Sequence, residues 1–375
     1  MSRASRLFHP LCGSNLTTLL PLLAGNGPLA LNRLPAAMIA LSTVLLRWPF
    51  SAAERALLRW SWRRYPPMQA PVFIIGYWRS GTTHLHNVLS QSVAFGHVSP
   101  LAAGLPWDML GIARALAPVL ARALPRDRYV DSIPVTPDSP QEDSIALANM
   151  LPLSYYHGLY FPKRFRHHFR RGVYFEGCRP DEIERWRRTL IYFLQKVSIH
   201  QQGKQLLLKN PVYTGHVARL RAIWPEAKFI HIYRSPYVLF PSTRHFFTRL
   251  FPELAFQRYD NVELDELILE SYPKLMNAVL VDAAALPASS YVEVRFEDFQ
   301  VAPMRELETV YRTLELPGFK DARQRFETYL ASVRGYRTNR YRFDREMIEL
   351  VEQHWSAFIR RWGYDPPGSA GDRLN

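Results

Sequence analysis

Residues 72–83 read Val72-Phe73-Ile74-Ile75-Gly76-Tyr77-Trp78-Arg79-Ser80-Gly81-Thr82-Thr83. The first four are apolar, which is typical of a strand buried on both faces of a sheet, and the pattern after the second glycine predicts a helix to about Ser90. A Gly-x-x-x-x-Gly loop that joins a strand to a helix N-terminus directs successive backbone N–H groups toward one anion. The stretch therefore predicts a phosphate-binding loop in an α/β protein.

Strand-like runs recur along the chain with helical patterns between them. We expect further strands at 205–208, 228–233 and 291–296, and long helices at 181–200 and 262–286. The second of these helices is expected to bend at Pro273. Strands that alternate with helices favour a parallel sheet with helices on both faces and a ligand at the carboxyl ends of the strands.

The loop differs from that of a nucleotide triphosphatase. Such a loop needs Lys after its second glycine to reach the β- and γ-phosphates, and this chain has Thr82 there. The cation is instead Arg79, which precedes Gly81. A kinase or other phosphoryl transferase on the same fold is therefore the weaker alternative.

Two segments together resemble the sulfotransferases that use 3′-phosphoadenosine 5′-phosphosulfate (PAPS). Trp78-Arg79-Ser80-Gly81-Thr82-Thr83 is similar to the 5′-phosphosulfate loop of that family. The strand and turn at 228–236, with Arg234 and Pro236, followed by Ser242, resemble the family's 3′-phosphate element. Arg and Ser placed in this way can bind one phosphate from two sides. The second phosphate distinguishes PAPS from ordinary nucleotides.

Three weaker matches extend the resemblance over about residues 71–362. Lys209-Asn210-Pro211 is similar to the segment that places a Lys near the sulfuryl group, and 291–299 is similar to the family's late strand and acidic turn. Residues 337–342 resemble its late basic loop. The resemblance implies a P-loop-like, three-layer α/β fold with a central parallel sheet, here with an N-terminal helical extension.

The resemblance also implies roles for individual residues, without a metal. Arg79 and Lys209 would stabilise the charge that develops during sulfuryl transfer. The 5′-phosphate would be held by the backbone N–H groups of Ser80, Gly81, Thr82 and Thr83 and by the two threonine hydroxyls. The 3′-phosphate would be held by Arg234, Ser242 and Arg337. Arg234 and Ser242 could instead have only local partners, and Lys209 could be a surface lysine.

The general base does not follow from the resemblance. Small-molecule sulfotransferases place a His where this chain has Pro211. Other branches use a Glu, and the best candidate is Glu142, with Asp143 second. The alternative is that these acids only begin a helix, where carboxylates are favourable.

Other polar and aromatic residues are expected to have structural roles at least as readily as functional ones. His84 and His86 would pack or make polar contacts under the loop, and His157 would line or support the substrate pocket. The aromatic cluster formed by Tyr155, Tyr156, Tyr160, Phe161 and Phe165 is more typical of a core than of an acceptor platform.

Charge and cysteine content restrict the partners and the compartment. The formal net charge is +14, which favours anionic ligands. The basic residues are spread along the chain, so we expect no nucleic-acid partner. Cys12 and Cys178 form no metal or redox motif, and the simplest expectation is a reducing, cytoplasmic compartment.

The first part of the chain, 1–70, is predicted to be an apolar helical extension. Proline, glycine and arginine interrupt its apolar runs, so short buried helices are expected first. The alternatives are a helical hairpin on a membrane surface, with arginines on the following segment, and a membrane anchor.

The rest of the chain, 71–365, would form the sulfotransferase domain, with a substrate-shaping insertion at about 99–172 and a loose tail at 366–375. Within the insertion we expect a helix over 105–124, interrupted at Pro118, and an extended segment at 131–141. Asp344 is expected to cap a helix that runs to about Trp362.

The predicted activity is transfer of a sulfuryl group from PAPS to a hydroxyl or amine. The apolar extension and the aromatic insertion favour a lipid or glycan acceptor, with a soluble carbohydrate or a protein side chain left open. A third alternative is a membrane-surface protein that keeps the loop without its activity.

Overall fold

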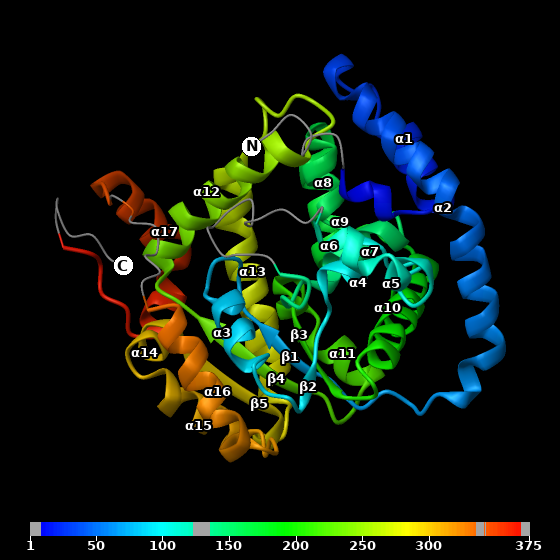
Figure 1. The fold of residues 1–375 in the computed structure, drawn as a ribbon. Coiled ribbons are helices and arrows are strands. Elements are labelled where there is room, and N and C mark those ends of the chain that lie inside the picture. Colours follow the sequence, from blue (N-terminus) through cyan, green and yellow to red (C-terminus); the bar gives the residue numbers. More distant parts are fainter. Residues whose placement is uncertain (1–8, 123–135, 335–340, 342, 369–375) are drawn as a thin grey trace. The chain divides into compact units, whose positions relative to one another are not determined.

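The computed structural model describes residues 9–122, 136–334, 341 and 343–368. The chain divides into two compact units. Unit 1 comprises Met1–Gln69, Gly96–Lys204 and Thr248–Val262. Unit 2 comprises Ala70–Phe95, Gln205–Phe247 and Glu263–Asn375. Figure 1 shows the elements in chain order.

The sheet is built almost entirely by unit 2. Its strands are β1 (Val72–Ile75), β2 (Phe95–Gly96), β3 (Gln205–Lys209), β4 (Lys228–Tyr233) and β5 (Tyr291–Arg295), in the order β2-β3-β1-β4-β5. β1 lies between β3 and β4 and is parallel to both, and β4 is parallel to β5. The four strands predicted from apolar runs are confirmed, and so is the parallel sheet. The two-residue β2 was not expected, because so short a strand has no periodicity to detect.

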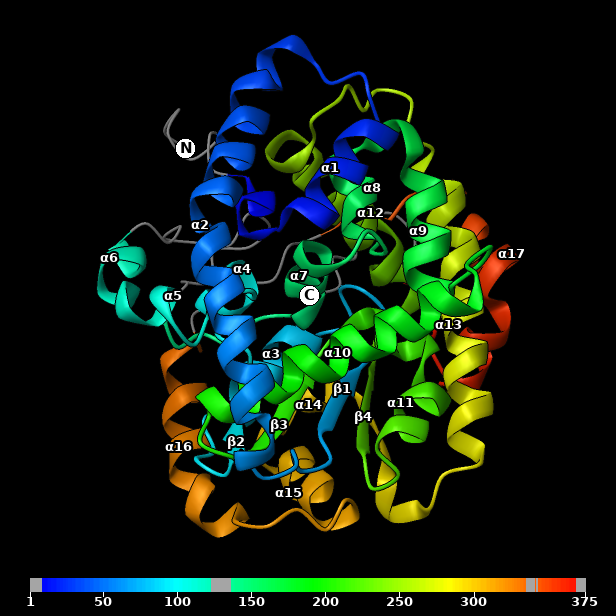
Figure 2. The same cartoon turned by 90° about the vertical axis from the view of Figure 1, so that its right-hand side faces the viewer.

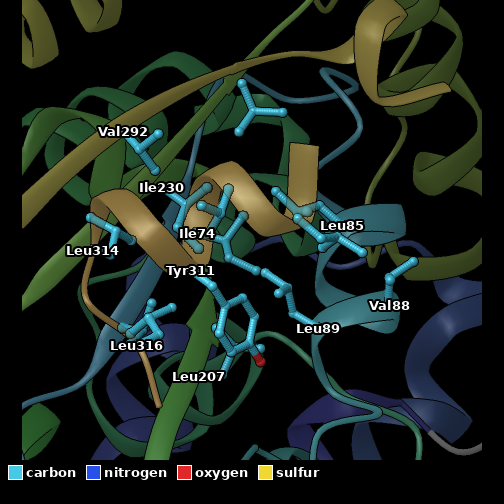
Figure 3. Packing of buried hydrophobic residues seen from close by; sticks show 14 of the residues in the cluster. Ile74, Leu85, Val88, Leu89, Leu207, Ile230, Val292, Tyr311, Leu314 and Leu316 are labelled. Carbon is cyan, nitrogen blue, oxygen red and sulfur yellow. The ribbon is translucent and has the colours of Figure 1, made fainter. Parts of the chain in front are cut away.

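One face of the sheet is covered by α3 (Thr82–Leu89), α14 (Phe296–Val301), α15 (Pro303–Thr313) and α16 (Phe319–Ser332). Alternate residues of the strands, including Ile74 and Ile230, point into this layer and pack against Leu85 and Tyr311, as Figure 3 shows. Burial of these side chains from both layers stabilises the elements on either side of the loop.

The other face of the sheet carries the neighbouring strand residues. Phe73 stacks on Phe229 with ring centroids 5.5 Å apart and meets Tyr213 edge to face. Helices α11 (Val217–Ile223), α13 (Leu264–Ala284) and α17 (Arg345–Arg361) belong to this unit. Asp344 accepts a bond from the Met347 N–H, which confirms the predicted cap. Unit 2 is therefore the predicted three-layer α/β arrangement.

Unit 1 is helical. Its α-helices, apart from the end of α12 (Pro236–Leu254), are α1 (Leu16–Gly25), α2 (Leu34–Ser61), α4 (Pro100–Gly104), α5 (Ile112–Ala115), α6 (Ala117–Arg122), α7 (Asp143–Met150), α8 (Tyr156–Tyr160), α9 (Phe165–Tyr174) and α10 (Pro180–His200). The helix predicted over 105–124 with an interruption at Pro118 is wrong in its start and in the place of the break: turns precede α5, and the break falls at Leu116. Pro118 lies in the first turn of α6, where its missing N–H costs little. Of the extended segment predicted at 131–141, residues 131–135 lie outside the described residues, and 136–141 contain a turn at Pro137 and Asp138 but no helix or strand.

Helix α2 corrects the expectation of short buried helices. It is 28 residues long and continues through both Arg47 and Pro49. With its flanking turns it spans Leu31–Arg64, long and apolar enough to cross a membrane, yet only 28% of its most apolar window is buried. Within the helix, Arg47 forms an ion pair with Asp108 inside unit 1. Figure 2 shows α2 as a long helix with α1 at its upper end.

Candidate anion-binding site

The loop after β1 has three residues in the left-handed region of backbone space. They are Gly76, Arg79 and Gly81, with φ of 145°, 71° and 98°. A Cβ on Gly76 would overlap the carbonyl oxygen of Ile232, and a Cβ on Gly81 would overlap the ring of Phe296. Glycine is therefore required at both places. Arg79 has a Cβ and still adopts a positive φ, so the backbone of the loop is strained at this cationic residue.

Contacts inside unit 2 hold the loop in this shape. The N–H of Gly76 donates to Thr214 Oγ1 at 2.8 Å, and Ser80 Oγ donates to the Tyr77 carbonyl at 2.8 Å. The Tyr77 hydroxyl lies 2.7 Å from Ser271 Oγ on α13. The loop is thus tied to the segment after β3 and to a helix, so its backbone geometry is set before any ligand binds.

The loop also touches the second predicted phosphate element. Arg79 Nε donates to Ser242 Oγ on α12 at 3.2 Å. Arg234 follows β4 directly, and its Nη1 is 3.4 Å from the Arg79 carbonyl. Tyr341 donates to Ser242 Oγ at 3.2 Å. Residues distant in sequence therefore bring two guanidinium groups and two hydroxyls together at one edge of the sheet.

Arg234 is a buried cation. It is 6% exposed, and its guanidinium carbon lies 4.3 Å from the ring centroid of Phe296. Burial lowers the pKa of Arg234 to about 10, an effect that Glu297 opposes and that Arg79 reinforces. Burial of Arg234 and the nearby charge of Arg79 both disfavour the charged form, so a bound anion would stabilise it and this set of donors fits a phosphate group.

Lys209 is the last residue of β3 and is only 2% exposed. The N–H of the following residue, Asn210, donates to the Ile74 carbonyl of β1 at 3.3 Å. The carboxyl ends of these two adjacent parallel strands therefore place Lys209 and the loop on the same edge of the sheet. A surface lysine, the alternative considered from the sequence, does not match this burial.

The acidic candidates for the base lie in unit 1. Glu142 is the residue before α7, where its side chain makes no capping bond and instead accepts from Ser144 Oγ at 3.1 Å. Asp143 is the first residue of the helix and is 1% exposed. The role of Glu142 as the base stays a prediction.

The histidines make structural contacts. His86 is buried, and its Nε2 lies 3.3 Å from the Leu207 carbonyl of β3, whereas the His84 ring packs near Phe299. His157 is fully buried beside the Ala148 carbonyl, 2.9 Å from its Nε2, and burial lowers its pKa to about 4. A buried, neutral histidine with a backbone partner has a structural role in unit 1.

The aromatic cluster belongs to the core of unit 1. Tyr155, Tyr160, Phe161 and Phe165 are all at most 3% exposed, and Tyr156 is half-buried. The Tyr156 ring contacts Tyr155 and Tyr160, the rings of Tyr155 and Phe165 contact Phe169, and Phe161 contacts Phe256, as expected for a packed core.

Sequence reasoning missed some residues that shape the site. Thr214 orients Gly76, and Phe296 packs against both Gly81 and Arg234. Thr214 lies shortly after the predicted strand end at Lys209, and this position near the carboxyl end of a strand could have indicated it as a site residue. Arg337 lies outside the described residues.

Fold and site together define a parallel α/β protein with two guanidinium groups and two hydroxyls gathered at the carboxyl edge of its sheet. Residues 71–321 match the model of the sulfotransferase family. The chain belongs to the sulfotransferase family, and it is an enzyme of that class.

The relatives and solved structures agree with this assignment. The omega-hydroxy-beta-dihydromenaquinone-9 sulfotransferases Stf3 of Mycobacterium bovis and Mycobacterium tuberculosis are each 32% identical to the chain over 297 residues, 79% of this chain and 75% of theirs. The crystal structure of the sulfotransferase STF1 from M. tuberculosis has a TM-score of 0.61 at 18% identity and covers 91% of this chain and 90% of that one. STF9 from Mycobacterium avium has a TM-score of 0.67 at 16% identity, covering 83% and 82%. The two structures show the same fold.

Proposed function

We propose that the enzyme transfers the sulfuryl group of PAPS to a hydroxyl group of a lipid. PAPS is proposed as the donor because the loop contacts the second phosphate element. There Arg79 bonds to Ser242 and lies beside Arg234. PAPS carries a phosphosulfate on its 5′ position and a phosphate on its 3′ position. Two neighbouring arginines, one in each phosphate element, suit such a molecule.

The residues of unit 2 divide the work. Backbone N–H groups from Ser80 to Thr83, at the N-terminus of α3, bind the 5′-phosphate. Arg234 and Ser242 bind the 3′-phosphate, and Arg337 is assigned to the same group by resemblance. Arg79 and Lys209 stabilise the negative charge that develops on the bridging and sulfuryl oxygens. PAPS supplies the activated sulfuryl group, and we propose that no metal is required.

Glu142 is proposed as the base that accepts the proton of the acceptor hydroxyl. A carboxylate within hydrogen-bond reach of that hydroxyl would raise the transfer rate without contributing to donor binding. We therefore expect Glu142→Gln to lower kcat far more than it weakens PAPS binding. Equal losses in both would contradict the assignment.

A lipid acceptor is supported by two observations. The curated relatives are named for a sulfotransferase reaction on a hydroxylated menaquinone derivative, which is a lipid, and they are 32% identical to this chain. The chain itself carries the long apolar helix α2. Together these favour an enzyme that acts in peripheral contact with a membrane. We propose the cytoplasm as its compartment because the two free cysteines fit a reducing environment.

Donor binding is tested by calorimetric titration with adenosine 3′,5′-bisphosphate, the product left after transfer. We expect saturable binding that Arg234→Ala weakens strongly. Arg187→Ala is a suitable control, because that arginine lies on the surface of unit 1 in a pair with Glu184. Absence of saturable binding would refute the donor, and Mg²⁺-dependent ATP turnover would favour a kinase. Mass spectrometry of lipid extracts from cells with and without the enzyme would then identify the acceptor.

A further inference from the structure

One side of α2 exposes large apolar side chains along nearly its whole length. Each of the following is more than half exposed: Met38, Leu45, Leu46, Trp48, Leu57 and Trp60. Soluble proteins rarely expose so many large apolar residues in one continuous strip. We call this side of α2 the outer strip.

The opposite side of α2 is buried in unit 1, where small and apolar side chains surround two ion pairs. Glu54 pairs with Lys196 of α10 at 2.6 Å and accepts the N–H of Gly111 at 2.7 Å. Arg47 pairs with Asp108, which is 2% exposed at its side chain. Arg47 and Glu54 are therefore both paired inside unit 1. Glu54 is the sole acidic residue in the sequence from 31 to 64, so the outer strip carries no negative charge.

Positive charge follows the apolar part of the strip. Arg59, Arg63 and Arg64 are exposed at the end of α2 and in the turn after it. The guanidinium of Arg64 lies 4.3 Å from the ring centroid of Trp60. Tryptophan and arginine side by side are typical of the region where acyl chains meet headgroups.

We propose that the outer strip of α2 lies flat in the surface of a bilayer that contains anionic lipid. The apolar side chains would enter the boundary between headgroups and acyl chains, and the three arginines would contact lipid phosphates. Charge complementarity favours a lipid surface over a second copy of this chain, whose own strip is equally basic. The claim that this surface delivers the acceptor rests on the proposed function, whereas membrane binding itself does not.

The contacts of the buried side exclude a helix that spans the membrane. A spanning orientation would surround the helix with hydrocarbon, and it would have to break the Glu54–Lys196 and Arg47–Asp108 ion pairs. Moving such charges to the centre of a bilayer is costly. An interfacial orientation keeps both pairs intact and covers only the outer strip.

The test is flotation of the purified full chain with vesicles of phosphatidylcholine alone or mixed with phosphatidylglycerol. We expect binding that increases with phosphatidylglycerol and weakens with salt. The double variant Leu45→Asp/Leu46→Asp should lower partitioning by about 100-fold. Arg59→Glu/Arg63→Glu/Arg64→Glu should lower it by at least about tenfold on the anionic vesicles only.

The matched control is Val281→Asp/Val301→Asp. These valines are 72% and 86% exposed in unit 2, so the control adds the same charges to apolar surface elsewhere. It should bind vesicles like the wild type. Failure of the wild type to bind, or equal binding by the Leu45/Leu46 variant, would overturn the proposal. Self-association of the wild type without lipid, lost in that variant, would assign the strip to a second copy instead.

Two further measurements address orientation and independence from the donor site. Alkaline carbonate should release the protein from membranes, and resistance to carbonate would indicate a spanning helix. Brominated lipid should quench the fluorescence of Trp48 and Trp60, so Trp48→Phe/Trp60→Phe should lose that quenching. Titration of the Leu45/Leu46 variant with adenosine 3′,5′-bisphosphate should match the wild type. Failed vesicle binding with normal donor binding would therefore reject this inference and leave the proposed function standing.

Discussion

Arg79 combines an unfavourable backbone conformation with a side chain that lies in the candidate site. Its φ of 71° is unfavourable for any residue with a Cβ, yet glycine is absent there. The side chain reaches Ser242 and is proposed to contact the sulfuryl group. Strain that a substitution to glycine would relieve is therefore retained because the guanidinium is needed.

Replacing Arg79 by glycine should separate these two effects. We expect Arg79→Gly to keep or raise the thermal midpoint relative to Arg79→Ala, because glycine tolerates a positive φ. Both variants should lose at least about 100-fold in kcat, because the cation is gone. Differential scanning calorimetry and a transfer assay measure the two quantities. An active Arg79→Gly enzyme would remove Arg79 from the catalytic assignment.

Gly81→Ala should disrupt the loop. The new Cβ would meet the Phe296 ring, and the φ of 98° would become strained. We expect donor affinity to fall by at least about tenfold, since a left-handed residue alone costs roughly 1–2 kcal/mol. Gly104→Ala is the control, because a Cβ there meets nothing within 4 Å. Titration with adenosine 3′,5′-bisphosphate compares the two, and unchanged affinity in Gly81→Ala would show that the loop does not bind the donor.

Buried histidines make unit 1 sensitive to acid. Burial lowers the pKa of His9 to about 3, of His157 to about 4 and of His168 to about 2. Below the unfolded value of 6.5 the unfolded chain binds protons that the folded chain does not, so stability is full above that pH and falls as pH decreases. Each histidine contributes up to about 1.4 kcal/mol per pH unit.

His157→Gln tests this dependence, because an amide can still donate to the Ala148 carbonyl without titrating. We expect the urea midpoint of the variant to change less than that of the wild type between neutral and mildly acidic pH. Parallel changes in both proteins would show that His157 does not control the acid response.

At the scale of elements, α2 is held in unit 1 by a buried ion pair between Glu54 and Lys196. Lys196 is fully buried, and desolvation lowers its pKa, while Glu54 opposes that shift. Removing one member of a buried pair leaves the other charge unpaired, which costs more than removing both.

Lys196→Met should therefore destabilise the protein by about 3–5 kcal/mol. The double variant Lys196→Met/Glu54→Gln should recover most of the loss, because an amide oxygen can still accept the Gly111 N–H. Chemical denaturation measures both. The exposed pair of Arg187 with Glu184 is the control, and Arg187→Met should have little effect. A double variant no more stable than Lys196→Met would contradict the coupling.

Local patterns were sufficient for the sheet and the loop but not for α2. Apolar runs marked β1, β3 and β4 because these strands are largely buried on both faces, whereas in β5 buried and partly exposed residues alternate. Asp344 marked a helix start because its side chain accepts a nearby N–H. Proline, glycine and arginine predicted short helices in this part of the chain, whereas α2 is 28 residues long. Its Arg47 has a tertiary partner, Asp108, that no local pattern reveals.

At the scale of the whole molecule, the described residues that are proposed to bind PAPS all belong to unit 2. Adenosine 3′,5′-bisphosphate should therefore protect the amides of the loop and of the start of α12 from hydrogen exchange. At a thousand times its Kd it should stabilise the folded protein by about 4 kcal/mol. Protection absent from both segments would place the ligand elsewhere.

The sequence by itself determined an α/β fold with a glycine loop between a strand and a helix, because strand periodicity and glycine spacing act over a few residues. The resemblance of two segments to a known family indicated a sulfotransferase. The tertiary structure alone decided which groups complete the site and which helix face stays exposed. Thr214, Phe296 and Tyr341 contact site residues distant in sequence, and Asp108 and Lys196 bury the charges of α2. Such contacts depend on where the chain folds back on itself, so they leave no local pattern.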